Sequence, residues 1–307
     1  MILPIVAASI VAVAGLVLRV VAARRIERAI SDRLPLNPDG IVRGAASISL
    51  HRDDAAHAVL VIHGFGDTPQ SMSYLAEYLH ARGYAVSVPL LPGHGRTLRA
   101  FGGSQSDEWI NAARDELKVL RGRHRHVSIA GLSMGGAIAA ILAAEYRDVS
   151  SLVLLAPFFE ASAAVRLVAS VPHIFAAIFP FIAGSGERSI RDPAERARNL
   201  AYRASTPAVV RELTRLANRA RSALPGIEAP VLIIQSRKDY RVAPAVAERA
   251  LNAVGSLVKR VEWLENSGHV ISVDFGRERV FALAAEWMEM HCGKADLAAA
   301  DTAITND

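Results

Sequence analysis

Cysteine is almost absent from this sequence, since Cys292 is the one example among 307 residues. A single thiol excludes an intramolecular disulfide framework and any zinc site built from several cysteines. It is compatible with any cellular compartment. No grouping of histidine, cysteine and acidic residues along the chain resembles a metal site either, so we expect no bound metal.

A concentrated block of one charge is also missing. The formal net charge is +5 and the isoelectric point about 9.6, yet basic residues are scattered and mixed with acidic ones. No basic stripe interleaved with aromatic side chains is found, and this argues against nucleic acid as a partner. Half of the residues are hydrophobic, enough for a sizeable core, and the length suits one α/β domain with an insertion.

Charge is absent from the first residues, Met1 to Leu18. This stretch could cross a hydrocarbon core of about 30 Å if Arg19 extends toward the interface. The basic residues of the region follow the segment, at Arg19, Arg24, Arg25, Arg28 and Arg33. We therefore predict a membrane anchor over residues 1–23, with a cytoplasmic catalytic domain. A cleaved signal peptide with export is the alternative, although its usual basic start is missing, and a buried or peripheral helix is another.

Short β-rich runs then alternate with helical stretches. Strands are expected within 57–63, 84–95, 126–131, 151–156, 230–235 and 261–265. Helices are expected over 68–83, over 106–122, directly after Ser133, and over 275–291. The first run, HAVLVIH, is almost continuously apolar, as in a strand that is buried on both faces. This alternation predicts a mostly parallel sheet with helices on both faces.

The alternation is interrupted once, and the interruption defines the expected domain plan. Residues 158–227 look helical and predict a cap over the sheet edge. Its phenylalanines Phe175, Phe179 and Phe181 are candidate contacts for an acyl chain. The alternative is that they belong to a helix that packs its own apolar face against the sheet domain. The remaining divisions are a linker with the first strand or strands at 24–56, the core at 57–157 and 228–292, and a flexible tail at 293–307.

A serine stands between a predicted strand and a predicted helix in the motif GLSMG, residues 131–135. Two glycines flank it, as a tight strand-to-helix turn requires, and this arrangement is typical of a nucleophile elbow. We predict that Ser133 is a nucleophile whose oxyanion is stabilised at the helix N-terminus. The alternative is a glycine-rich packing turn with an incidental serine.

A serine hydroxyl needs a base, and the base needs an orienting acid. His269 lies in NSGHVIS, after the strand at 261–265, and Asp239 lies in QSRKDYRVAP, after the strand at 230–235. Both loops leave the same edge of the predicted sheet as Ser133. Glu265 is a weaker candidate for the acid. The order Ser133, Asp239, His269 is that of one hydrolase fold.

The motif HGFGDTP, residues 63–69, follows the first long strand with two glycines that allow its backbone to approach the serine. A tetrahedral intermediate needs N–H donors for its oxygen. We predict that the amides of Phe65 and Met134 form this oxyanion hole. A plain glycine turn is the alternative.

Together, the motifs HGFGDTP, LPGHGRT, GLSMGG, QSRKDYRVAP and NSGHVIS resemble the serine α/β-hydrolases from about residue 55 to residue 291. Within them the chain is most similar to the bacterial carboxylesterase and monoacylglycerol lipase group. The resemblance implies the α/β-hydrolase fold, hydrolysis of a small-molecule or lipid ester through an acyl-enzyme, a helical cap and no cofactor. It also implies Ser133 as nucleophile, His269 as general base and acid, and Asp239 as the orienting acid.

Other functions share these residues. Acyl transfer, thioester hydrolysis and C–C bond cleavage use the same triad, because the fold leaves the leaving group open. A membrane-tethered, non-catalytic binding protein is a further alternative. Serine at the elbow argues against dehalogenase or epoxide hydrolase chemistry, which needs a carboxylate nucleophile. The sequence leaves the oligomeric state open.

Overall fold

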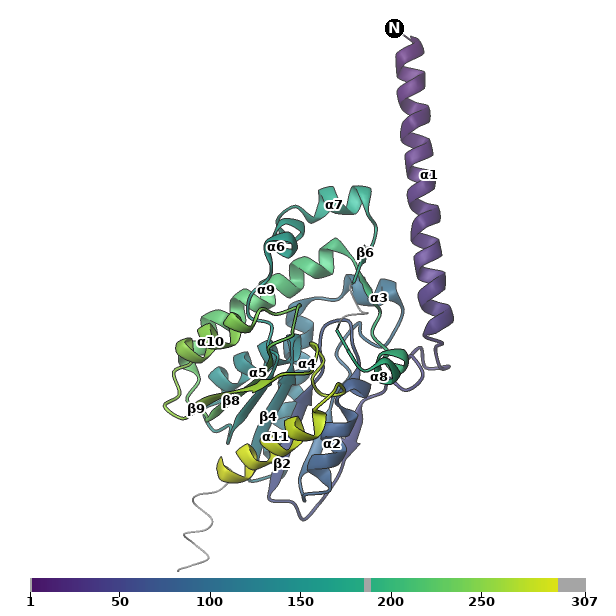
Figure 1. Cartoon of the computed structure of the whole chain (residues 1–307). Coiled ribbons are helices and arrows are strands. Elements are labelled where there is room, and N and C mark those ends of the chain that lie inside the picture. The colour runs from purple at the N-terminus through teal and green to yellow at the C-terminus, as the bar shows by residue number, and fades with distance from the viewer. Residues whose placement is uncertain (1, 185–188, 292–307) are drawn as a thin grey trace, which may run out of the picture.

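The central sheet has the expected parallel arrangement (Figure 1). The computed structural model describes the backbone of residues 2–184 and 189–291, and side chains from residue 15 onward within those ranges. Across the sheet the strands are β1 (Ile48–Leu50), β3 (Ala85–Val88), β2 (His57–Ile62), β4 (His126–Leu132), β5 (Leu152–Leu155), β8 (Val231–Ser236) and β9 (Lys259–Leu264). Edge strand β1 pairs antiparallel with β3, and every other neighbouring pair is parallel. The prediction of a mostly parallel sheet is confirmed.

Helices cover both faces of the sheet, which explains why its strands are so continuously apolar (Figure 1). In β2, Leu60 and Ile62 pack in one core cluster, whereas Val59 and Val61 pack in the other. The first cluster includes side chains of α4 (Ser106–Arg123), α5 (Met134–Glu145), α9 (Pro207–Ala223) and α10 (Pro244–Ala253). The second includes α2 (Ser73–His80) and α11 (Arg277–His291).

The helix expected over 68–83 is divided into two elements. A 3-10 turn, η1 (Pro69–Met72), precedes α2. The division falls at Met72, whose φ of −110° and ψ of 0° depart from α-helical values. The short strand β1 and the short helix α3 (Leu98–Gly103) were not individually predicted.

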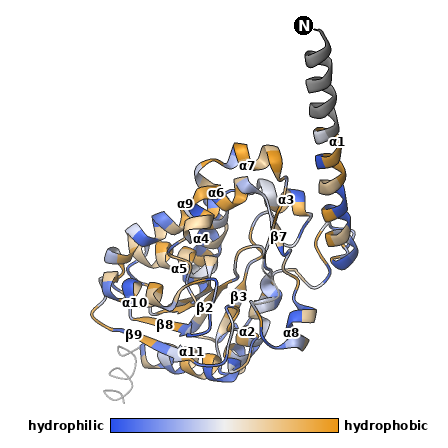
Figure 2. Cartoon of the chain, turned by 45° about the horizontal axis from the view of Figure 1, so that its top comes forward, coloured by the Kyte–Doolittle hydropathy of each residue, from blue (hydrophilic) through white to orange (hydrophobic). Residues whose placement is uncertain are grey.

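The segment between β5 and β8 covers the carboxyl edge of the sheet (Figure 1). It contains α6 (Ala163–Ser170), α7 (Pro172–Ile178), α8 (Pro193–Arg198), α9 and the 3-10 turn η3 (Leu224–Gly226). It is not purely helical, because β6 (Ile182–Ala183) and β7 (Ala204–Ser205) form a small antiparallel pair. Figure 2 shows hydrophobic residues on α7. Apolar side chains on and just beyond α6 and α7 are exposed, namely Leu167, Val171, Ile174, Ile178 and Phe179.

The chain begins with a single long helix, α1 (Ile2–Arg33), which projects away from the domain (Figure 1). Near its end, Ile26 and Ile30 pack against the core, and Arg33 donates to the backbone oxygens of Asn199 and Ala201. Among the described residues, no helix combines the length and apolar character needed to span a membrane, so the predicted anchor is not supported. The side chains of residues 1–14 and the predicted tail at 293–307 lie outside the described residues.

Candidate active site

Ser133 occupies a strained turn between β4 and α5, with φ of 53° and ψ of −112°. Positive φ is unfavourable for a residue with a side chain. The flanking glycines make the turn possible. A Cβ atom on Gly131 would overlap the carbonyl oxygen of Gly135, and one on Gly135 would overlap the carbonyl oxygen of Ile62. The strand therefore passes directly into the helix with the serine at the corner.

The structure brings Ser133, His269 and Asp239 into one hydrogen-bonded chain. His269 Nε2 lies 2.8 Å from Ser133 Oγ, and His269 Nδ1 lies 2.7 Å from Asp239 Oδ2. All three residues are buried. A carboxylate at Nδ1 favours the tautomer in which Nδ1 carries the proton, and this leaves Nε2 free to accept the serine proton.

Backbone and side-chain donors surround the carboxylate of Asp239. Its Oδ1 accepts from the amides of Arg241 at 2.7 Å and Val242 at 3.0 Å, and its Oδ2 accepts from Gln235 Nε2 at 2.9 Å. Burial opposes its ionisation, but the charge and hydrogen bond of His269, with the two amides, lower its pKa overall. The rival acid Glu265 is exposed and pairs with Arg237 instead, at 3.1 Å.

The glycine-rich loop after β2 passes close to the serine. A Cβ atom on Gly64 would lie 3.7 Å from the Cβ of Ser133. The amides of Phe65 and Met134 donate no hydrogen bond within the described part of the chain. For Met134 this follows from its place as the first residue of α5, where helical N–H groups lack partners. Both amides are thus available for an oxyanion.

A buried histidine ties this loop to the next one. His63 Nδ1 donates to the carbonyl oxygen of Gly64 at 3.0 Å, and its Nε2 accepts from the amide of Leu91 at 3.2 Å. Its ring packs against that of His94 with a centroid distance of 5.1 Å. Both rings are fully buried. Only the neutral form of His63 satisfies both hydrogen bonds, because Nε2 must accept.

This buried pair predicts a loss of stability in acid. Burial lowers the pKa of His63 to about 4, despite the hydrogen bond to Gly64, and also lowers the pKa of His94. Between pH 6.5 and pH 4 the unfolded chain binds protons that the folded chain does not, so the free energy of unfolding falls as pH falls. From pH 7 to pH 5 we expect a loss of about 2 kcal/mol from His63 alone, measured by urea denaturation.

A matched pair of variants checks the source of this dependence. Replacing His94 with phenylalanine, whose ring suits the neighbouring Phe101 and Trp109, should reduce the pH dependence by the part that His94 contributes and leave the part that His63 contributes. His173→Gln, at an exposed position on α7, should leave it unchanged. Asp67, whose pKa burial raises to about 6, contributes with the opposite sign over this range, so the variants are compared with the wild type. A pH dependence that is the same in His94→Phe as in the wild type would contradict the assignment to this pair.

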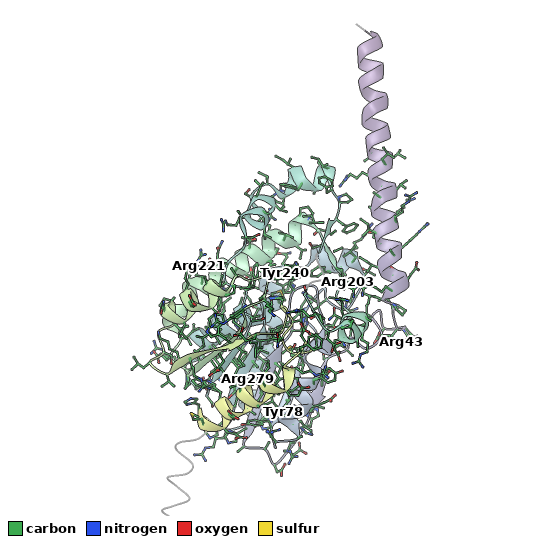
Figure 3. The ribbon with its side chains drawn as sticks, in the orientation of Figure 1. Arg43, Tyr78, Arg203, Arg221, Tyr240 and Arg279 are labelled. Atoms are coloured by element: carbon green, nitrogen blue, oxygen red, sulfur yellow. The ribbon has the colours of Figure 1, made fainter. Side chains whose placement is uncertain are left out.

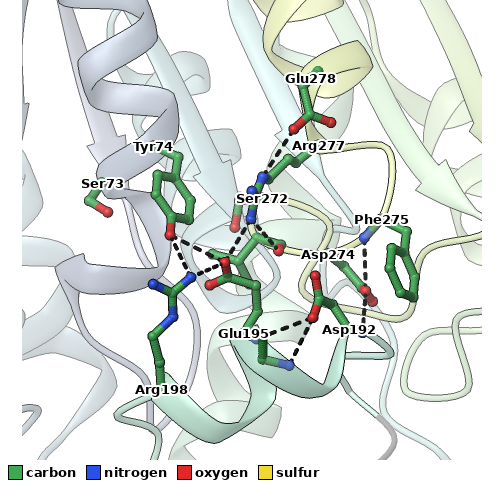
Figure 4. A network of polar contacts seen from close by, with 12 residues as sticks. Ser73, Tyr74, Asp192, Glu195, Arg198, Ser272, Asp274, Phe275, Arg277 and Glu278 are labelled. Atoms are coloured by element: carbon green, nitrogen blue, oxygen red, sulfur yellow. Dashed lines mark hydrogen bonds and ion pairs between the residues drawn. The ribbon is translucent and has the colours of Figure 1, made fainter.

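Asp274 holds the His269 loop against the cap, a role that sequence reasoning missed (Figure 4). Its Oδ2 accepts from the amides of Gly268 and Arg191, at 2.6 and 2.8 Å, and its Oδ1 from those of Asp192 and Phe275, at 2.9 and 2.8 Å. The side chain is almost fully buried. Four donors thus converge on one carboxylate between the loop and residues 191–192.

Replacing Asp274 with asparagine should lower kcat about tenfold, with a smaller change in KM, and should destabilise the fold by about 2 kcal/mol. The side-chain NH2 group of asparagine cannot accept hydrogen bonds. Two of the four buried backbone N–H groups therefore lose their acceptor, and His269 shifts. Steady-state kinetics and thermal unfolding measure the two effects. Asp115→Asn, at an exposed carboxylate on α4, is the control. Wild-type kcat in Asp274→Asn would show that the loop holds its position without this side chain.

A second buried carboxylate, Glu195, joins the cap to α2 and α11, the two helices that cover one face of the sheet (Figure 4). Glu195 of α8 accepts from the hydroxyl of Tyr74 at 3.2 Å, and it pairs with Arg277 at 2.8 Å and with Arg198. Tyr74 belongs to α2 and Arg277 to α11. The start of α8 is therefore fixed to the domain on the side of the catalytic histidine.

A cavity of about 470 Å³ opens beside the three hydrogen-bonded residues. Ser133, His269 and Phe65 line it, with an apolar wall that includes Phe101, Phe158, Val165 and Leu213. The predicted contacts Phe175, Phe179 and Phe181 are not among its described lining residues. Phe179 is exposed and Phe181 packs against the core, so the acyl-chain contact of these residues stays a prediction. Within the described ranges, no three or more histidine, cysteine and acidic residues are grouped to hold a metal ion.

The chain is similar to known hydrolases over most of its length. The sequence model of a family described as "Serine aminopeptidase, S33" matches residues 53–275. A thermostable monoacylglycerol lipase of Bacillus sp. (strain H-257) is 29% identical over 240 residues, which are 76% of this chain and 91% of that protein. A carboxylesterase of Bacillus subtilis (strain 168) is 24% identical over 234 residues, 76% of this chain and 92% of that protein.

Solved structures agree with these similarities. A structure described under "LipS and LipT, two metagenome-derived lipolytic enzymes" has a TM-score of 0.75 and 29% identity, and it covers 83% of this chain and 100% of its own. The monoacylglycerol lipase of Paleococcus ferrophilus has a TM-score of 0.67 at 20% identity, covering 76% of this chain and 94% of its own, a likeness of fold.

Proposed function

Since the chain belongs to the serine aminopeptidase S33 family of α/β-hydrolases, we propose that it cleaves carboxylic esters through a triad of Ser133, His269 and Asp239. The predicted family is confirmed. So is the class of reaction, because the relatives named above are lipases and carboxylesterases, which hydrolyse ester bonds. The assignment of catalytic roles to individual residues is our own inference.

In the proposed mechanism, His269 takes the proton of Ser133 as Oγ attacks the ester carbonyl carbon. The carbonyl oxygen becomes an oxyanion, which the amides of Phe65 and Met134 receive. His269 then gives its proton to the departing alcohol, and an acyl-enzyme remains on Ser133. Water, activated by the same histidine, releases the acid. Asp239 keeps the ring oriented and stabilises its charged form throughout.

One observation carries this proposal. The hydroxyl of Ser133 sits at a strained corner, 2.8 Å from a histidine that is itself 2.7 Å from a buried carboxylate. Strain of this kind is retained where surrounding structure enforces it, and it clusters at active sites. The apolar cavity beside the serine favours an ester with an apolar acyl group, as in a carboxylesterase or monoacylglycerol lipase.

Labelling of the purified protein with a fluorophosphonate tests the mechanism, because the reagent reacts with an activated serine. Peptide mapping should locate the adduct on Ser133. Hydrolysis of p-nitrophenyl esters of increasing chain length tests the cavity. Activity should extend beyond the butyrate ester, and activity that vanishes there would contradict an apolar acyl pocket. An unlabelled protein without turnover would instead favour a non-catalytic binding protein.

A further inference from the structure

Three arginines line the cavity beside Ser133, although its wall is otherwise largely apolar: Arg196, which belongs to α8, Arg203 and Arg241. Arg203 follows α8, and its Nη2 donates to the carbonyl oxygen of Arg196 at 2.7 Å. Arg241 lies two residues after Asp239, and its Nε donates to Ser189 Oγ at 3.2 Å. In Figure 3, Arg203 and Tyr240, the neighbour of Arg241, lie where the cap meets the sheet domain. Two separate loop segments thus place positive charge beside the site.

Neither Arg203 nor Arg241 forms an ion pair with a carboxylate in the part of the chain that the structure describes. The carboxyl group that lines the same cavity, Asp67, has other partners. It accepts from the amide of Thr68 at 2.9 Å and from Asn199 Nδ2 at 3.4 Å. Burial raises the pKa of Asp67 to about 6. Within the described ranges 2–184 and 189–291, Arg203 and Arg241 therefore have no carboxylate counter-ion.

The backbone of Arg203 is strained, with φ of 61°. A hydrogen bond of 2.7 Å from the amide of Gly184 to its carbonyl oxygen holds it beside β6. Left-handed backbone costs about 1–2 kcal/mol for a residue with a side chain. Burial, and in addition the nearby charge of Arg203, lower the pKa of Arg33. The fold thus places a cation here against both strain and like charge, which points to a role in binding.

We propose that Arg203 and Arg241 form a subsite for an anionic group, a carboxylate or a phosphate, carried by the ester that the cavity holds. The proposal rests on the proposed ester hydrolysis. A guanidinium offers a planar fork of N–H donors that matches the oxygens of either anion. The apolar wall would hold the body of the same substrate. The preferred ester is therefore amphiphilic, with an apolar body and one negative end.

The anion could belong to either half of the ester. On the acyl side it would be the free carboxylate of a dicarboxylic acid monoester. On the alcohol side it would be a phosphate, as in a monoacylglycerol phosphate. Both present the same chemistry to the arginines, and matched substrates separate them.

The experiment compares two pairs of substrates with the full-length protein. The first pair is the mono-p-nitrophenyl ester of adipic acid and its methyl-capped counterpart. The second is monooleoylglycerol phosphate and monooleoylglycerol. We expect kcat/KM to be about tenfold higher for the anionic member of at least one pair, since a hydrogen bond to a charged group typically contributes that much. The pair that shows the preference identifies the half that carries the anion.

Variants then test the two residues. Arg203→Gln and Arg241→Gln should each reduce the ratio of anionic to neutral kcat/KM several-fold, and the double variant should bring it to about one. Added salt should reduce the wild-type ratio as well. Arg221→Gln, at an exposed position on α9, removes the same charge and should leave the ratio unchanged.

The possible failures are distinct. Hydrolysis of the neutral esters at rates equal to or above those of both anionic partners would overturn the subsite and leave the proposed function standing. An unchanged ratio in the double variant would overturn the assignment to these arginines. A protein that hydrolyses none of the four substrates and resists fluorophosphonate labelling would overturn both proposals. The wild-type ratios decide the matter even if a variant fails to fold.

Discussion

Replacing Ser133 with alanine is expected to lower kcat for ester hydrolysis by about 10⁵- to 10⁶-fold and to abolish fluorophosphonate labelling. The triad acts as a unit, so without the nucleophile the base and acid contribute almost nothing. The residual rate would come from the oxyanion donors and substrate binding. Initial rates on a p-nitrophenyl ester and gel detection of the labelled protein measure the two effects.

The fold of this variant should be retained, because alanine replaces serine at the same backbone conformation and removes only one oxygen. Circular dichroism and thermal unfolding check this. Ser222→Ala, at an exposed position on α9, is the matched control and should keep full activity. If Ser133→Ala kept more than about 1% of wild-type turnover, another nucleophile would have to be sought.

Replacing Gly135 with alanine should destabilise the protein by at least about 3 kcal/mol and abolish activity. Gly135 lies in the first turn of α5, where alanine would normally be favoured by about 1 kcal/mol. Its position against β2 reverses this sign. The added Cβ would overlap the carbonyl oxygen of Ile62 and lie 2.6 Å from that of His63. These are backbone atoms of β2 and of the loop that carries the proposed oxyanion donor.

Gly122→Ala provides the control within the same fold. A Cβ atom on Gly122, near the end of α4, meets nothing within 4 Å, so this variant should be stabilised by about 0.5 kcal/mol. Urea denaturation followed by circular dichroism compares the two variants. Wild-type stability in Gly135→Ala would mean that β2 and α5 can separate without cost, contrary to their close approach.

The elements that carry the proposed chemistry could be predicted from sequence because each has a local signature. Ser133 and Asp239 follow strands with short apolar runs, His269 follows the β-rich segment VEWLE, and parallel strands bring their carboxyl ends to one edge. The glycines around Ser133 marked the turn. The limits of β2, β4, β5 and β8 were predicted within a few residues, since buried strands have clear apolar patterns.

The cap and its attachments could not be predicted in the same way. Asp274 binds the amides of Arg191 and Asp192 across 82 to 83 positions of sequence, and Glu195 reaches Tyr74 across 121. Such contacts depend on how a segment folds back onto the domain, and no periodic pattern of apolar residues in the sequence predicts them. The surroundings of Phe175, Phe179 and Phe181 could not be predicted for a related reason, because apolar composition does not reveal which way a short helix faces.

The long N-terminal helix is attached to the wall of the cavity. Its last residue, Arg33, is bonded to the carbonyl oxygens of Asn199 and Ala201, and both residues line the cavity. A helix of this length is a stiff rod of about 48 Å. It is therefore a lever fixed at one end to the wall of the proposed substrate site. A force or restraint on the N-terminal end of α1 would therefore act as a torque on the segment around Asn199 and Ala201, at the proposed substrate site.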